Sequence, residues 1–431
     1  MRFDSRALLL RVLIAAIPLF VVTLSLGQDA SLPALDGFVT RVTSPLDFEV
    51  NGVKVLLSKA TEAHLQTGNT KSYIATSDIR PYVGEAAQIF GRLHKKAHTV
   101  DATDIRLRQA EPHEVSGSGI VDSILPSPGD AHAPDDHLVR ADGYSVLVSA
   151  KTTVVFTPSL SADTAFRANV WITFHGTQRP DGVVVAAKAA FSENVISGGE
   201  DKLRASREYD PAAVDPAAKQ SGLSKAFLGV NPKLIPPYKD DAMQARISMI
   251  GARLVPQYQR DLPDSDQTKI NFRFQLIDTT RWRDALALPN GIILVPRQVV
   301  QRMQNDSQLA TVLADNIVCV LEKQYLHMLP SAHKMTAAQV AGSAGGIFVP
   351  GLGIATLGGN MVVSSRLLHA FEQQSGRVSL GLLRDAGYDI YEAPRAWWLL
   401  APVTPTDTAN TPLPRRAAYL YQMLGENWRV Q

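Results

Sequence analysis

The sequence contains a single cysteine, Cys319, among its 431 residues. One cysteine excludes an internal disulfide framework and any zinc or iron–sulfur site that is built from several thiolates. Net charge is also scarce, because 43 lysines and arginines against 41 aspartates and glutamates leave a formal charge of only +2. This balance lacks the basic surface that nucleic acids require, so we expect no nucleic-acid partner.

A hydrophobic fraction of 45% excludes wholesale disorder, and the length predicts two or three domains. Residues 1–30 combine three arginines with an apolar run from Val12 to Leu26 and a small-residue pair, Ser25 and Gly27. This order is typical of a signal peptide, and the run is shorter than the ~20 apolar residues of a membrane-spanning helix. We therefore expect a secreted or periplasmic protein. The alternative is an N-terminal anchor, with membrane association through residues 7–26 at the inner membrane.

Residues 34–194 show the alternating pattern of β-strands in two copies. The turn pair Asn51–Gly52 is a strong hairpin signal, and Asp142–Gly143 stands at the matching place in the second copy. The two copies predict two small β-barrels, at 34–112 and 113–194, which resemble the OB-like barrels found in tandem in bacterial secreted proteins. Glycine, proline and charged residues then predict a linker over 195–239.

Residues 240–431 predict an α+β domain. Three sequence motifs stand out: DALALPNGIILV at 284–295, LATVLADNIVCV at 309–320, and AGYD at 386–389 followed by APRAW at 393–397. Their residues and their order resemble motifs of the HtpX-like and BepA-like zinc metallopeptidases. The resemblance covers most of this domain and implies a metallopeptidase-like fold, so the fold class expected for the chain is two small all-β barrels followed by an α+β domain.

The same resemblance implies a zinc site that this sequence does not preserve. The family motif H-E-x-x-H supplies two zinc ligands and a general base from one helix, and a later glutamate supplies the third ligand. Here the two histidine positions hold Asp315 and Cys319, the base position holds Asn316, and the third-ligand position holds Gln374. An amide is no general base and only a weak zinc ligand. We therefore expect no zinc and no catalytic residue, although a residual metal on Asp315 and Cys319 is left open.

Relatives bind extended peptide along a strand of this domain, and the resemblance implies that role for Gly291, Ile292, Ile293, Leu294 and Val295. The alternative is a buried strand within a closed sheet. The glycine-rich run at 342–360 is expected to form a lid or a buried loop. The sequence thus favours a metallopeptidase-like pseudoenzyme that binds a peptide or protein partner. A zinc endopeptidase with an unusual ligand set and a purely structural interaction module are the alternatives.

Overall fold

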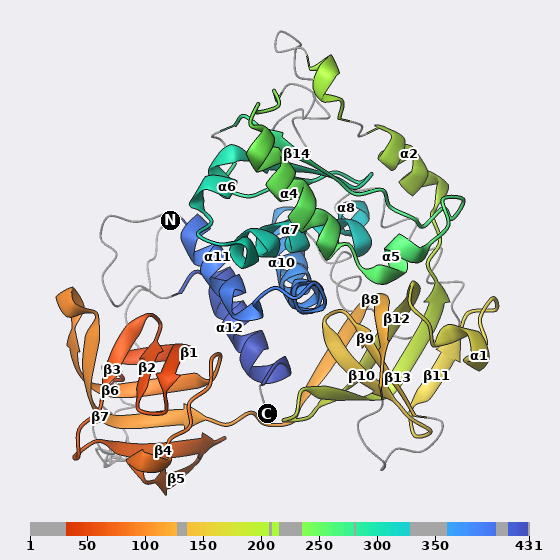
Figure 1. Cartoon of the computed structure of the whole chain (residues 1–431). Helices are drawn as coiled ribbons and strands as arrows, with labels where there is room; N and C mark the ends of the chain where they lie inside the picture. Colours follow the sequence, from red (N-terminus) through yellow and green to blue (C-terminus); the bar gives the residue numbers. More distant parts are fainter. Residues whose placement is uncertain are drawn as a thin grey trace, which may run out of the picture.

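The computed structural model describes residues 32–126, 136–206, 209–214, 235–279, 282–327, 360–401 and 413–429. The signal or anchor segment expected at 1–30 and the glycine-rich run up to residue 359 lie outside the described residues. The chain has mixed α/β content with three sheets, and Figure 1 shows two β units below a predominantly helical domain. This arrangement agrees with the expected order of β-structure followed by an α+β domain.

The first β unit contains seven strands. They are β1 (Leu35–Ser44), β2 (Asp47–Val50), β3 (Val53–Leu56), β4 (Glu62–Thr67), β5 (Thr70–Ile74), β6 (Ala86–His94) and β7 (Thr99–Arg108). The sheet order is β3-β2-β1-β6-β7-β4-β5, and β3 also pairs with β7 in parallel. Alternate apolar side chains such as Val39, Phe48 and Ile89 are fully buried in its core.

The second β unit contains a closed five-stranded barrel. Its elements are β8 (His113–Leu125), β9 (His137–Ala141), β10 (Tyr144–Val148), β11 (Thr153–Phe156), α1 (Ala162–Ala165), β12 (Val170–Gln178) and β13 (Val183–Glu193). The order is β10-β9-β8-β12-β13-β11, and a parallel pairing of β10 with β13 closes the barrel. The strand β11 is added beside β13 in parallel.

The two β units share local structure at matching positions. Asn51 and Asp142 both adopt left-handed backbone conformations, with φ of 49° and 51°, at the first position of their hairpin turns. In each unit a buried threonine after the third strand donates its hydroxyl hydrogen across the core. Thr61 donates to the carbonyl of Ala102 at 2.7 Å, and Thr152 donates to that of Ala186 at 2.8 Å. The sequence similarity between the copies therefore extends to the details of their turns.

The helical domain surrounds a three-stranded sheet of order β14-β16-β15. The strands are β14 (Arg273–Ile277), β15 (Leu286–Ala287) and β16 (Ile292–Pro296). The helices are α2 (Gly198–Ser206), α4 (Asp241–Leu254), α5 (Gln257–Asp261), α6 (Arg297–Arg302), α7 (Asp306–Leu321), α8 (Gln324–His327), α10 (Asn360–Asp385), α11 (Ala393–Leu400) and α12 (Arg415–Asn427), with short 3-10 turns at Pro211–Ala213 and Ile390–Glu392. None of the helices in the described part is both long and apolar enough to cross a membrane.

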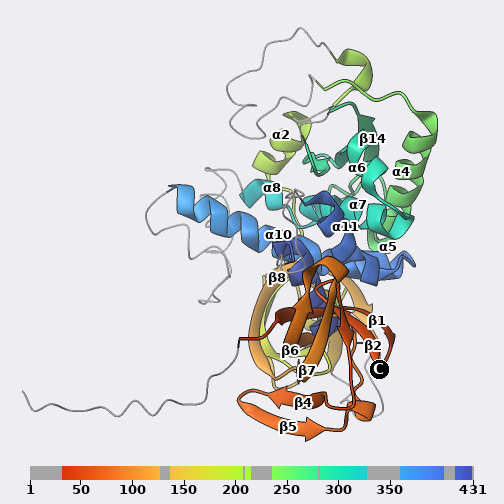
Figure 2. The same cartoon turned by 90° about the vertical axis from the view of Figure 1, so that its left-hand side faces the viewer.

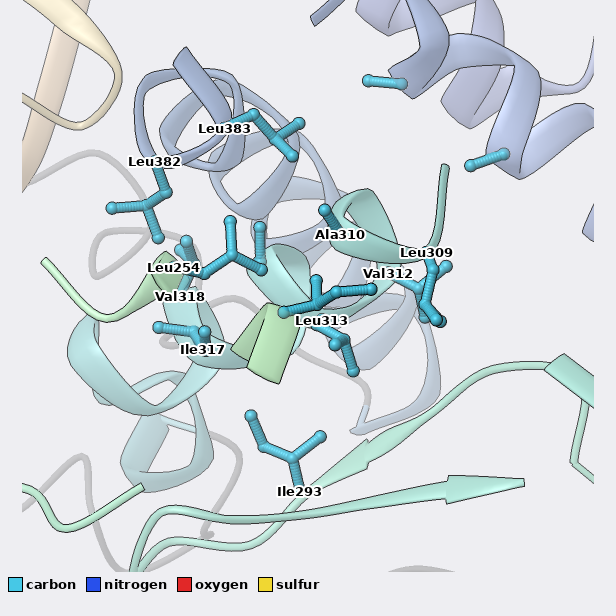
Figure 3. Packing of buried hydrophobic residues seen from close by; sticks show 14 of the residues in the cluster. Leu254, Ile293, Leu309, Ala310, Val312, Leu313, Ile317, Val318, Leu382 and Leu383 are labelled. Atoms are coloured by element: carbon cyan, nitrogen blue, oxygen red, sulfur yellow. The ribbon is translucent and has the colours of Figure 1, made fainter. Parts of the chain in front are cut away.

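Helix α7 lies at the centre of this domain. The Asn305 side chain accepts a hydrogen bond from the backbone N–H of Gln308 and so caps the helix start. Nearly every side chain of α7 is buried, because α4, α10 and the sheet cover it on different sides. Figure 3 shows Leu313 and Ile317 of α7 between Leu254 of α4 and Ile293 of β16. A helix that is buried on all sides is normally apolar on every face, so the buried polar residues of α7, among them Asp315 and Asn316, are exceptions.

The segment 195–239, expected to be a linker, contains α2, which is fixed to the domain. The Glu200 carboxylate is 1% exposed and forms an ion pair at 3.0 Å with the Lys323 ammonium group. Glu200 also accepts hydrogen bonds from Tyr325 and Arg204. A polar helix with one buried carboxylate has no apolar stripe, which is why its composition suggested a linker.

Candidate functional site

Helices α7 and α10 bring together the positions at which the sequence resemblance predicts a zinc site. The Cys319 Sγ of α7 lies 3.6 Å from the Ser375 Oγ of α10, the residue next to Gln374. Asp315 is one turn before Cys319 on the same helix face. Asp315, Cys319 and Gln374 are thus close together, and the side chain of each is hydrogen-bonded to another group of the protein.

Asp315 is paired with a cationic side chain from α12. The Arg416 Nη2 donates to the Asp315 Oδ2 at 2.7 Å, and the Arg416 Nη1 donates to the Asp284 Oδ2 at 2.8 Å. The guanidinium group also lies over the Trp397 ring, with 3.2 Å between its central carbon and the ring centroid. Arg416 thereby supplies a fixed positive charge beside Asp315, the first ligand position that the resemblance predicts.

The electrostatics of Asp315 reflect this burial. Its residue exposure is 5%, and its Oδ1 has no hydrogen-bond partner among the described residues. Burial raises the pKa of Asp315 to about 6, although Arg416 acts in the opposite direction. A carboxylate held in this way belongs to an internal ion pair.

Asn316 and Cys319 have no catalytic chemistry in this setting. The Asn316 amide donates to the carbonyl of Val312 in its own helix at 2.9 Å. An amide accepts no proton at ordinary pH, so Asn316 cannot act as a general base. Burial, followed by the charge of Asp315, raises the pKa of the Cys319 thiol to about 12, which keeps it a neutral thiol.

Gln374 points across the boundary to the second β unit. Its amide nitrogen donates to the carbonyl of Ser118 in β8 at 2.9 Å. Its amide oxygen accepts from the Gln324 side chain, also at 2.9 Å. Gln374, for which the resemblance predicts a ligand position, therefore makes a contact between domains.

The residues present do not fit the zinc ion that the resemblance implies. Zinc prefers thiolate, imidazole or carboxylate donors that converge on one point. The Cys319 thiol is neutral, the Gln374 amide oxygen is engaged, and the Asp315 carboxylate already neutralises Arg416. Within the described ranges, no group of three or more His, Cys, Asp and Glu side chains could hold a metal.

The candidate peptide-binding strand is the central strand of its sheet. Ile292, Ile293, Leu294 and Val295 are buried, and β16 pairs with β14 in parallel and with β15 in antiparallel fashion. Gly291 precedes the strand with a φ of +89°, against the Ile270 side chain. The alternative of a buried strand agrees with these pairings, in which β15 covers β16 at Ile293 and Leu294. Peptide binding at Gly291–Val295 stays a prediction.

Sequence reasoning missed a buried polar contact between the helical domain and the second β unit. The Arg377 Nη2 donates to the Asp142 Oδ1 at 2.7 Å, and the side-chain oxygens of Glu322 accept from the backbone N–H of Ile120. Burial, together with the charge of Asp142, raises the pKa of Glu322 well above its usual range. The one signal in the sequence was the charged residue at the Asp142–Gly143 turn, where the first copy has an asparagine.

The first β unit meets the helical domain mainly through close backbone approach. Gly52, in the hairpin turn after β2, lies where a Cβ would be 2.7 Å from the Trp398 ring of α11. Gly84 lies against the backbone of α12 at Tyr421 and Gly425. The Arg429 guanidinium covers the Tyr82 ring at 4.7 Å from its centroid. No protein-family model matches the chain.

Proposed function

We propose that this chain is a non-catalytic scaffold of metallopeptidase-like origin that binds a peptide or protein outside the cytoplasm. In this proposal the helical domain is related to the HtpX-like and BepA-like peptidases, and the two β units are OB-like barrels. The helical domain holds the β units, and the β units present surface to the partner. Fold likeness alone says nothing of activity, so the proposal rests on the site.

The observation that carries the proposal is the Arg416 guanidinium between Asp315 and Asp284. A zinc peptidase needs an open metal position with a polarised water and a basic carboxylate beside it. At these positions the chain instead has an internal ion pair, an amide and a neutral thiol. The Asp315 carboxylate thus has its cation within the protein, without a ligand.

The strand pairings support the OB-like part of the proposal. In each β unit the first strand pairs with the second and with the fourth barrel strand, and a parallel pairing of the third and last barrel strands completes a ring. The buried contacts of Gln374 and Arg377 with β8 and Asp142 support the role of the helical domain as a platform.

A cleavage assay on the full chain tests the non-catalytic assignment. We expect no cleavage of casein above background after incubation with zinc, and the same background for Asp315→Asn. Cleavage that requires zinc and falls in Asp315→Asn would instead establish the alternative, an endopeptidase with an unusual ligand set. Circular dichroism of the variant shows whether it retains the fold.

A further inference from the structure

The last strand of the first sheet, β5, has one free side. It pairs with β4 over its full length and with no other strand in the described part of the chain. The ring of pairings through β1, β2, β3, β7 and β6 closes without it. In the second unit the corresponding segment forms α1 instead of a strand. Figure 2 shows the β4–β5 hairpin at the end of the first unit that is away from the helices. The edge is therefore a feature that the fold does not need for closure.

The hairpin geometry determines which main-chain groups face outwards. Gly68 and Asn69 form a two-residue loop, and Gly68 has a φ of +55°. Such a loop closes on a hydrogen-bonded pair, here Thr67 with Thr70, and bonded and non-bonded pairs then alternate along the ladder. The N–H and C=O groups of Lys71 and Tyr73 consequently point away from β4. They form a short row of unpaired donors and acceptors.

The side chains beside this row favour an acidic partner. Lys71 is the only charged residue of β5, and it is exposed. Cross-strand pairing aligns it with Gln66 of β4 and Arg108 of β7. No carboxylate stands in this row.

The neighbouring row offers an aromatic anchor. It contains Tyr73, His64 and Arg106. The His64 and Arg106 side chains are both bonded to the Asp104 carboxylate at 2.8 Å, so among the described residues the unpaired positive charge at this edge is that of Lys71. Tyr73 is 67% exposed, and its ring lies edge-on to the His64 ring. Exposed tyrosines are typical anchors of protein interfaces.

The opposite face of the same edge carries the exposed Thr70 and Ser72 and ends in an apolar residue, Ile74. Ile74 of β5 and Leu65 of β4 are half-buried and pack at the margin of the first core. A strand laid beside β5 would place alternate side chains next to Lys71 and Tyr73 on one face and next to Ile74 on the other.

We propose that the outer edge of β5 binds an extended peptide segment of alternating acidic and apolar residues as an added strand. This inference rests on the proposed scaffold function and names the surface and the partner class that it uses. Main-chain hydrogen bonds to Lys71 and Tyr73 supply affinity, and the two rows of side chains supply selectivity. Strand β16, by contrast, has a neighbouring strand on each side, β14 and β15.

Binding of a synthetic peptide to the full chain tests the proposal. The probe is a fluorescein-labelled peptide of seven residues that alternates glutamate and valine, and fluorescence anisotropy measures its Kd. Lys71→Pro removes an outward N–H that β4 does not use, so we expect roughly a tenfold weaker Kd. Lys71→Ala keeps the N–H and removes only the charge, so we expect roughly a threefold loss. The matched control peptide alternates lysine and valine and should bind at least tenfold more weakly than the acidic one.

Hydrogen exchange locates the binding. In the free chain the amides of Lys71 and Tyr73 should exchange quickly, while that of Ser72 is protected by β4; the acidic peptide should protect all three. No binding by the wild type at 1 mM, or equal binding by wild type and Lys71→Pro, overturns the proposal. Protection of Lys71 without peptide, accompanied by dimers in sedimentation, would assign the edge to a second copy and also overturn it. These outcomes are separate from the cleavage assay, so either proposal can fail alone.

Discussion

The two β units repeat one another in their turns and differ in how they join the helical domain. The second unit is joined through buried charges, with Arg377 bonded to Asp142 and Arg140 bonded to both Asp122 and Asp385. Both units also approach the helical domain closely at glycines, Gly84 in the first unit and Gly143 in the second. The first unit carries the exposed edge strand β5, where the second unit has α1. The difference indicates that one copy is fixed as part of the platform, whereas the other presents an edge.

The largest expected effect is on the attachment of the second unit. Arg377→Ala leaves the buried Asp142 carboxylate without its cation, and such losses cost about 3–5 kcal/mol. Urea denaturation of the full chain measures the change in the free energy of unfolding. Arg179→Ala, which breaks an exposed pair with Asp181 in the same unit, is the matched control and should cost about 1 kcal/mol or less. Equal effects of the two variants would contradict the attachment of the second unit through a buried ion pair.

The next effect concerns the attachment of the first unit. Gly84 has a φ of +92°, and a Cβ there would overlap backbone atoms of Tyr421 and Gly425 that no rotamer change can move. Gly84→Ala should therefore destabilise the contact by about 2–3 kcal/mol. Hydrogen exchange of α12 and of the loop around Gly84 should accelerate together. Gly198→Ala meets no atom within 4 Å and serves as the control, with no acceleration in either segment.

A smaller effect is a pH dependence confined to the first unit. Burial raises the pKa of Glu85 to about 8, against an ordinary value of 4.5, although the Tyr82 backbone N–H and the nearby Arg429 lower it. The native state therefore holds one more proton than the unfolded chain between these two values. Stability falls as the pH rises from about 4.5 to 8, because the carboxyl ionises freely in the unfolded chain but stays protonated in the buried native site.

The variant Glu85→Gln isolates this contribution. It should remove the decline and should be more stable than wild type at pH 9 by about 1 kcal/mol or more. Tyr82, Arg429 and Glu426 are the other charged or titratable groups that act on this region, and they are unchanged in the variant. Thermal unfolding at pH 5, 7 and 9 measures the effect. An unaltered pH profile in Glu85→Gln would show that the decline arises elsewhere.

How much of this the sequence predicts depends on whether a feature is local. The turn at Asn51–Gly52 follows from residues in direct succession, and the loss of a base at Asn316 follows from one residue type. The partner of Asp315 could not be predicted, because Arg416 is a hundred residues away and no spacing rule joins α7 to α12. Whether β16 lies at the centre or at the edge of its sheet was left open for the same reason, since strand order is set by tertiary packing. The apolar run at 291–295 predicts a strand but does not tell a central strand from an edge strand.

The proposed function depends on the ion pair in which Arg416 holds Asp315, at a position where the resemblance predicts a metal ligand. Isothermal titration of the full chain with zinc tests it most directly, with Asp315→Asn titrated in parallel. We predict no tight binding in either protein, and no difference between them, because the Asp315 carboxylate neutralises Arg416 and the Cys319 thiol stays protonated. One zinc ion bound per chain with a submicromolar Kd that Asp315→Asn abolishes would contradict the account.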